Sequence, residues 1–443
     1  MTPVWRWRLL VRVCRKWRQI IFGSPRRLHL QIFCTQKSPV RKNLDIWPNF
    51  PLIIAYFYNG RSIKPRGEGN VIAALKHPDR ICSVTLQVLA PHLERFTTMM
   101  LEPFPVLTHL FLESGGENAP VLPDGFLGGS APCLQKIIFY GVPFPALPTL
   151  LLSTNDLVML HLLNTPTTGY ISPEAMAVGL AALPRLEAFV IEFRLATARP
   201  NRICLVPPAT RTVLPALSYF AFHGASEYLE DLVAYIDSPQ LDEISISYLN
   251  QLVDFQVEQL SKFINRSVGP KLTLLRHVDV TFDSDRVSII PYANQSPGIL
   301  GPARTFINCN EIDWQVSHMA QVLSHLSVTL SSVVHLNLKV EPKGRQLMGM
   351  DDVEWQPLLR QFSTVKTLHV SQELAEHVAL ALEDITEEMV AEVLPSLNLI
   401  CLEGLPVSFI EKFIAVRRFF GRPVTVINTE REFEEGLKSY ARK

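Results

Sequence analysis

A few side chains in this chain have the types and spacing that catalysis or metal binding requires. His318 and His325 are seven residues apart and would share one helix face, but no carboxylate or cysteine at a fitting spacing completes a metal site. Asp384, Glu387 and Glu388 offer carboxylates for general acid catalysis, and a solvated helix face explains them more simply. The sequence contains no phosphate-binding loop, zinc-protease motif or serine-hydrolase elbow. We therefore expect no enzymatic activity, no metal and no cofactor.

More informative residues lie between the apolar positions of a short motif that recurs along the chain. If each copy is a strand, its first, fourth and sixth residues point into a core, and the third and fifth point to the opposite, concave face. Neighbouring strands lie about 4.8 Å apart, so equivalent residues would form continuous columns. The candidate partner-binding residues of these columns are His109, Phe111, Ile138, Met159, His161, Val190 and Tyr219.

These columns allow two interpretations. Their first part is apolar and aromatic, around Phe111, Ile138, Met159 and Tyr219, and an exposed patch of this kind suits a protein partner. Their second part is polar and rich in histidine. In the other interpretation, loops or helices cover the columns, and their residues form ordinary core.

The elements that must position these residues follow from the motif itself. An apolar residue is followed by two more, three and five positions later, and a Pro-x-Leu step often precedes it. From Leu107 through Leu134, Leu157, Leu186 and Leu217 to Leu241, the steps are 27, 23, 29, 31 and 24 residues. This is the period of a leucine-rich repeat, with one short strand and one helix or loop per unit. Weaker copies begin at Ile81, Leu275, Val333, Val365 and Leu397.

Helices, loops and further strands are predicted around the motif. Residues 7–22 have apolar side chains at helical spacing, and Leu52–Tyr56 is an apolar run that indicates an early strand. The polar stretch 59–70 contains three glycines and predicts a surface loop. A long gap between two later copies predicts a degenerate repeat around Phe306, with 284–301 as an inserted loop.

Composition restricts the partners and the compartment. The 443 residues include 42 basic and 42 acidic side chains, so no global field selects nucleic acid or a membrane. Eleven lysines and arginines precede the first acidic residue, Asp45, and acidic residues are frequent from 373 to 392. The basic start would also fit a mitochondrial presequence, or an arm that binds RNA or an anionic surface. Seven scattered cysteines without a C-x-x-C pair indicate a reducing compartment, the cytoplasm or nucleus.

Residues 9–30 resemble the second half of an F-box. They read Leu9-Leu-Val-Arg-Val-Cys-Arg-Lys-Trp-Arg-Gln-Ile-Ile-Phe-Gly-Ser-Pro-Arg-Arg-Leu-His-Leu30. With Pro39-Val-Arg-Lys-Asn-Leu and Trp47-Pro behind them, they are similar to a large group of fungal F-box proteins with degenerate leucine-rich repeats. The ending Gly421-Arg-Pro-Val-Thr-Val is also similar, so the resemblance covers nearly the whole chain.

The resemblance implies an F-box-type substrate-recognition subunit of a cullin-based ubiquitin ligase. An F-box docks on a Skp-type adaptor, and the repeats would hold an unknown protein substrate. By match to the motif, Val13 and Trp17 would pack in the last F-box helix, and Leu9 and Leu10 would lie nearer the docking surface. The family's F-box opens with a Leu-Pro motif and two helices that this sequence does not contain. The alternative is therefore a free-standing repeat scaffold that does not dock on the adaptor.

The expected fold is an irregular α/β leucine-rich-repeat solenoid, a horseshoe, with a short N-terminal F-box-like helix. We expect three parts: the partial F-box-like helix in 1–27, strands and a loop that cap the solenoid in 28–80, and the solenoid with its C-terminal cap in 81–443. No nucleic acid and no membrane are expected as partners. A doubly wound α/β sheet, which also alternates strands and helices, is the alternative fold.

Overall fold

The computed structural model divides the chain into two compact units. The first contains Met1–Arg194 and Leu214–Leu217, and the second contains Leu195–Val213 and Ser218–Lys443. The structure describes residues 11–23, 31–35, 40–44, 50–57, 63–116, 118–195, 210–249, 257–267, 276–292, 303–308, 312–325, 330–341, 353–386 and 388–427. Within these residues, no helix is long and apolar enough to cross a membrane.

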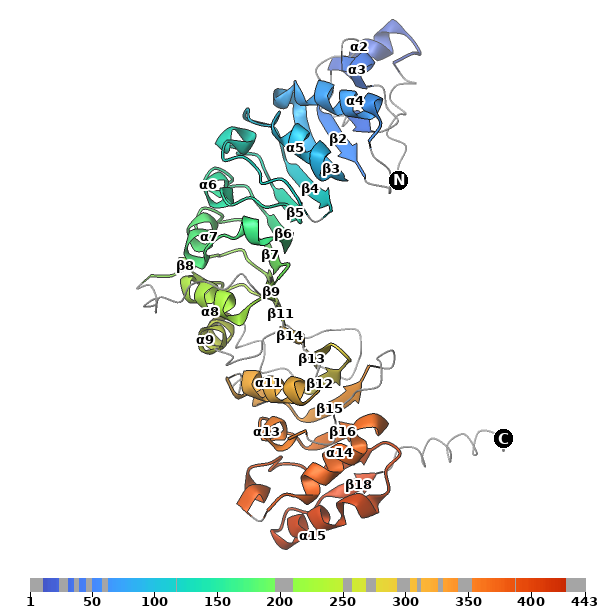
Figure 1. Cartoon of the computed structure of the whole chain (residues 1–443), viewed down its shortest axis with the longest axis vertical. Coiled ribbons are helices and arrows are strands. Elements are labelled where there is room, and N and C mark those ends of the chain that lie inside the picture. Colours follow the sequence, from blue (N-terminus) through green and yellow to red (C-terminus); the bar gives the residue numbers. More distant parts are fainter. Residues whose placement is uncertain are drawn as a thin grey trace, which may run out of the picture. The chain divides into compact units, whose positions relative to one another are not determined.

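The first unit contains a parallel sheet whose strands follow one another in chain order (Figure 1). Each strand pairs in parallel with the one before it. This order differs from that of a doubly wound sheet, in which the strand order reverses at a switch point. The strands are β1 (Ile32–Thr35), β2 (Leu52–Tyr56), β3 (Ile81–Leu89), β4 (His109–Gly115), β5 (Lys136–Tyr140), β6 (Met159–Thr165) and β7 (Ala188–Phe193).

Helical segments return the chain between these strands, because parallel neighbours require a crossover connection. From α4 to α7, they lie along one side of the sheet (Figure 1). The helical segments of the unit are α2 (Arg15–Gly23), α3 (Val40–Leu44), α4 (Pro65–Leu75), η1 (Pro78–Arg80), α5 (Ala90–Thr97), η2 (Phe126–Gly129), α6 (Leu147–Leu151), η3 (Thr167–Gly169) and α7 (Pro173–Leu180).

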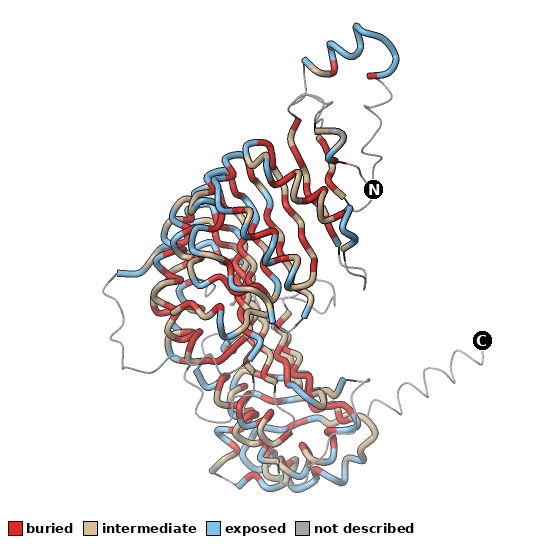
Figure 2. The backbone as a smooth tube through the Cα atoms, turned by 45° about the horizontal axis from the view of Figure 1, so that its top comes forward, coloured by how far each residue is buried: buried red, intermediate tan, exposed pale blue. Residues whose placement is uncertain are grey.

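The apolar positions of the motif form the interior of the unit. Leu107, Leu134, Leu157 and Leu186 are at most 1% exposed, and buried residues alternate with more accessible ones along the strands (Figure 2). This alternation follows from the two-residue period of a strand. The predicted stack of parallel strands is thus confirmed within this unit, and the horseshoe shape stays a prediction.

The segments before residue 81 agree with the sequence-based expectation in one strand and differ from it in a loop. The strand predicted at Leu52–Tyr56 is present as β2, and β1 and β2 continue the sheet. The loop predicted at 59–70 is wrong in its second half, where α4 begins with Pro65 in its first turn. Gly67 lies close to the ring of Tyr56, whose hydroxyl donates to the Gly67 carbonyl at 3.0 Å. The N-terminal helix begins at Arg15 after a turn, and residues 7–10 lie outside the described part.

The second unit contains a mixed sheet. Its strands lie side by side in the order β9, β11, β14, β13, β12, β15, β16, β17, β18. Only β13 is antiparallel to its neighbours among the described strands of this sheet. The strands are β9 (Tyr219–Gly224), β11 (Glu243–Tyr248), β12 (His277–Phe282), β13 (Arg286–Tyr292), β14 (Ala303–Asn308), β15 (His335–Val340), β16 (Thr367–Val370), β17 (Leu399–Leu402) and β18 (Thr425–Ile427). A separate pair joins β8 (Thr212–Val213) and β10 (Ile236–Asp237).

The loop predicted at 284–301 is also wrong, because β13 occupies its first part. A tight turn joins β12 to β13, in which the Asp283 amide donates to the Arg286 carbonyl at 2.8 Å. The Asp283 carboxylate accepts from the Ser284 amide at 2.7 Å and fixes the turn. The degenerate repeat around Phe306 is present as β14, but it pairs with β11 and β13.

Helices again connect the strands, and one of them is capped by a buried acid. Glu230 on α8 is buried, and its carboxylate accepts from the amides of Gln259 and Leu260, each at 2.8 Å, at the start of α9. Burial raises the pKa of Glu230 to about 7, although these hydrogen bonds act in the opposite direction. The helical segments are α8 (Ser226–Tyr235), α9 (Glu258–Ser267), α11 (Ile312–His325), α13 (Gln356–Leu359), α14 (Gln372–Glu383), η4 (Glu388–Ala391), η5 (Val407–Ile410) and α15 (Glu411–Phe419).

Candidate functional site

The strands of the first unit align the predicted residues in columns on the face opposite to the core positions. The register pairs His109 with Lys136, and Lys136 with Met159, in one column. In the next column it pairs Phe111 with Ile138, Ile138 with His161, and His161 with Val190. Side chains of one column therefore lie side by side at the strand spacing of about 4.8 Å.

The accessibility of these columns separates them from the core. His109 and Lys136 are exposed, and Phe111, Ile138, Met159 and His161 are half-buried. Val190 is an exception, because it is only 6% exposed and belongs to the interior. We call the six accessible residues (His109, Phe111, Lys136, Ile138, Met159 and His161) the strand face. It has apolar side chains at its centre and polar ones at one edge, which is the usual composition of a protein interface.

Both histidines of the strand face have a lowered pKa, which favours the neutral ring. Burial, and secondarily the positive charge of Lys136, lowers the pKa of His109, whose Nδ1 lies 2.8 Å from the Thr108 hydroxyl. Burial alone lowers the pKa of His161. The Nε2 atom of His161 is buried and has no hydrogen-bond partner in the described part of the chain, which costs free energy until a partner is supplied.

Beside the apolar column lies a polar one. Gln87, Glu113 and Tyr140 are aligned across β3, β4 and β5, and the Gln87 amide donates to Glu113 at 2.5 Å. Tyr140 is exposed. These residues give the strand face a second polar edge, which could satisfy hydrogen bonds around an apolar contact.

The second unit carries a polar network on its strands, as the sequence indicated. The rings of His277 and His335 stack with centroids 4.3 Å apart. Asp279 contacts Lys339 at 2.5 Å and accepts from Asn337 at 3.3 Å. The chain of polar contacts then continues from Asn337 to His369 at 3.1 Å, and from His369 to Glu403 at 3.3 Å. Tyr219, the seventh predicted residue, lies on β9 of this unit, half-buried and in register with Glu243.

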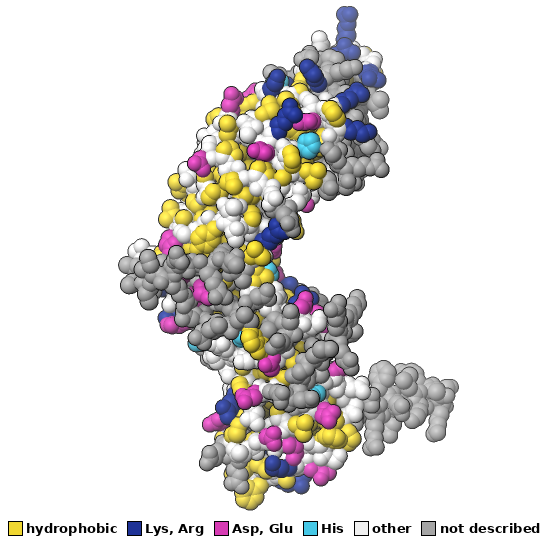
Figure 3. All heavy atoms as spheres, in the orientation of Figure 1, with side chains coloured by type: hydrophobic (Ala, Val, Ile, Leu, Met, Phe, Trp, Pro, Cys, Tyr) yellow, Lys and Arg dark blue, Asp and Glu magenta, His cyan; other side chains and the backbone are white. Residues whose placement is uncertain are grey.

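The predicted F-box residues lie only partly within the described residues. Val13 and Trp17 are 65% and 47% exposed in this structure, and their packing in an F-box stays a prediction. Val11 and Ile21 are buried instead, and Leu9 and Leu10 lie outside the described residues. Figure 3 shows lysine and arginine side chains gathered over the N-terminal elements.

The candidate metal and acid residues do not gather into a site. His318 is buried against Trp314, with ring centroids 6.0 Å apart, whereas His325 is exposed at the end of α11. No three potential metal-ligating side chains come together in the described parts of the chain. Asp384 is exposed at the end of α14, Glu387 lies outside the described residues, and Glu388 begins η4.

The fold and the strand face together define a βα repeat protein of mixed α/β class. No family model matches the sequence, and no curated protein matches it. Among solved structures, the leucine-rich repeat-containing protein LegL7 from Legionella pneumophila is similar at a TM-score of 0.27 and 12% sequence identity. That similarity covers 89% of this chain and 99% of the LegL7 chain.

Proposed function

We propose that this chain is a non-enzymatic interaction scaffold that holds a protein partner on its strand face. The observation that supports the proposal is the alignment of Phe111 with Ile138 as accessible apolar side chains, with Met159 accessible in the neighbouring column. His161, which is aligned with Ile138, has a ring nitrogen with no hydrogen-bond partner among the described residues. A preformed sheet loses little conformational entropy when it binds, so affinity comes from these side chains rather than from ordering the chain.

A finer form of the proposal makes the scaffold a substrate-recognition subunit of a cullin-based ubiquitin ligase. It rests on the resemblance of residues 9–30 to an F-box, through which the chain would dock on a Skp-type adaptor. By match to that motif, Leu9 and Leu10 would lie nearer the adaptor, and Val13 and Trp17 would pack in the last F-box helix. The compartment of such a subunit would be a reducing one, the cytoplasm or nucleus, because the seven cysteines are scattered without a C-x-x-C pair.

A scaffold that does not dock on the adaptor is the second candidate. It is favoured by the exposure of Val13 and Trp17, since these residues should be buried in a complete helical module. Binding of a purified Skp-type adaptor distinguishes the two. The ligase subunit should bind the adaptor and lose it after Trp17→Ala, whereas the free-standing scaffold should not bind at all.

Partner binding is tested by affinity capture from the source cells with two matched variants of the full chain. Ile138→Lys places a charge in the strand face, and Val178→Lys places one at an exposed position of α7. We expect a defined set of proteins to be captured by the wild type and by Val178→Lys, and to be lost from Ile138→Lys. Identical captured sets for both variants would refute the proposed function.

A further inference from the structure

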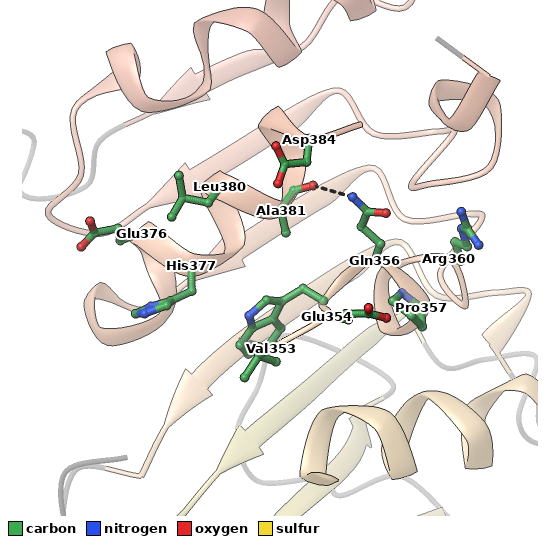
Figure 4. Close-up of a pocket in the computed structure, with 11 residues that line it drawn as sticks. Val353, Glu354, Gln356, Pro357, Arg360, Glu376, His377, Leu380, Ala381 and Asp384 are labelled. Carbon is green, nitrogen blue, oxygen red and sulfur yellow. Dashed lines mark hydrogen bonds between the residues drawn. The ribbon is translucent and has the colours of Figure 1, made fainter. Parts of the chain in front are cut away.

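A cavity of about 880 Å³ lies between α13 and α14 in the second unit (Figure 4). Its volume falls within the range of small-ligand sites, roughly 300–1,000 Å³. The side-chain amide of Gln356 donates to the Ala381 carbonyl at 3.2 Å and ties the two helices together. The proposed function makes no use of this cavity, which lies in a different unit from the strand face.

The α14 wall of the cavity presents an acid, an apolar residue and an acid at intervals of four residues. Glu376, Leu380 and Asp384 all line the cavity, and Figure 4 shows Leu380 between the two acids. With a rise of about 1.5 Å per residue, the two acids are about 12 Å apart along the helix and Leu380 is midway. Leu380 is 53% exposed, which leaves an apolar contact open to a ligand.

The lining carries a net negative charge, because its three acids outnumber its one arginine. Glu354, Glu376 and Asp384 form no ion pair with any described side chain. Arg360 also lines the cavity, but its guanidinium is directed to Glu392 at 3.6 Å. A ligand with positive charge would therefore be attracted to this rim.

The floor of the cavity carries an unsatisfied hydrogen-bond donor. Trp355 lines the cavity, is 1% exposed and packs edge-on against Phe282, with ring centroids 5.4 Å apart. Its indole Nε1–H has no acceptor among the described residues and is shielded from water. Leaving such a donor unpaired is unfavourable, so a ligand carbonyl that reaches it as lining side chains move aside would gain a hydrogen bond.

We propose that this cavity binds an extended protein segment of the pattern basic-x-apolar-x-basic. In an extended chain, alternate side chains point the same way, and residues four apart are about 13 Å apart. The two basic side chains would then meet Glu376 and Asp384, and the central apolar side chain would meet Leu380. The backbone supplies the carbonyl acceptor for Trp355. A helical ligand, about 10 Å wide, fits a cavity of this size less well.

The experiment uses the full chain and the peptide Lys-Ala-Leu-Ala-Lys-amide, which carries a fluorophore on its N-terminal amine and is followed by polarisation. We expect binding that weakens about tenfold in the double variant Glu376→Gln, Asp384→Asn, since two exposed ion pairs are lost. Glu373→Gln, an exposed acid of α14 outside the lining, is the matched control and should bind like the wild type. Equal affinity of the double variant and the control would overturn the proposal.

Two further measurements separate a protein segment from other cations and locate it. Spermidine has two terminal cations but no carbonyl and no apolar branch, so it should compete at least tenfold more weakly than the peptide. Competition as strong as the peptide's would make this a polyamine site and overturn the proposal.

The indole N–H resonance of Trp355, assigned from the Trp355→Phe spectrum, should shift when the peptide is added. An unchanged resonance at saturating peptide would place the segment outside this cavity.

Discussion

Glu230 makes the stability of the second unit depend on pH. Its contribution falls as pH rises, whereas that of most acids in folded proteins rises. Its carboxyl is buried, and its pKa rises from an ordinary value of 4.5 to about 7 in the folded chain. Between these two values the unfolded chain releases the proton and the folded chain retains it. Stability therefore falls as pH rises through this window, and it is constant above the folded pKa.

The size of the effect follows from the two pKa values. A pKa difference of 1 between the folded and unfolded chains corresponds to about 1.4 kcal/mol, and integration between pH of about 5 and 8 gives a loss of about 2.5 kcal/mol. Glu230→Gln removes the titrating group and keeps an oxygen that can accept from the Gln259 or Leu260 amide. The free energy of unfolding of the variant, relative to that of the wild type, should therefore rise by this amount over the same pH range.

The assay is urea unfolding of the full chain, monitored by hydrogen exchange at the amides of α9, at several pH values. Glu373→Gln is the control, because it removes an exposed acid from the same unit. The quantity to compare is the difference in unfolding free energy between each variant and the wild type. A difference for Glu230→Gln that stays constant with pH, or that shrinks as pH rises, would show that the pKa of Glu230 is not raised.

Three further predictions test the interior, the strand face and a turn. Leu217→Asp puts an unpaired charge in the core and should unfold the first unit, seen as rapid proteolysis. Phe111→Ala should keep the thermal midpoint and lose the partner; a loss of about 3–5 kcal/mol would instead make Phe111 a core residue. Gly128→Ala should destabilise more than Gly129→Ala in urea unfolding, since both have positive φ but only the Gly128 methyl would meet Pro103, at 2.7 Å.

The repeat strands were predictable because the core positions recur in a fixed pattern. Leu110 and Leu112 are buried at the fourth and sixth positions of their copy, as expected. β13 follows no such pattern, since it pairs antiparallel and contains Pro291, a residue that usually argues against a central strand. The only local sign of it was the polar turn at 283–286. Its pairing with β14 depends on residues further along the chain.

The sequence predicted which side chains of the strand face point away from the core, but not how exposed each of them is. Alternation determines which side chains leave the core, and it correctly separates Phe111 from Leu110. It does not determine how far neighbours cover a short side chain, and Val190 is buried together with Phe189 and Ile191. The cavity between α13 and α14 required the spatial pairing of Gln356 with Ala381, which no sequence pattern contains.

The strand order of the second unit also affects how this unit folds while the ribosome synthesises it. β11 ends at Tyr248, but its partner β14 ends at Asn308, which is 308 − 248 = 60 residues later. At about 5–20 residues per second, the ribosome takes about 3–12 s to supply that partner. Throughout this delay the nascent chain displays an unpaired strand edge, the kind of surface on which other chains add. Slow codons between these two strands would therefore lengthen the interval in which this protein depends on chaperones.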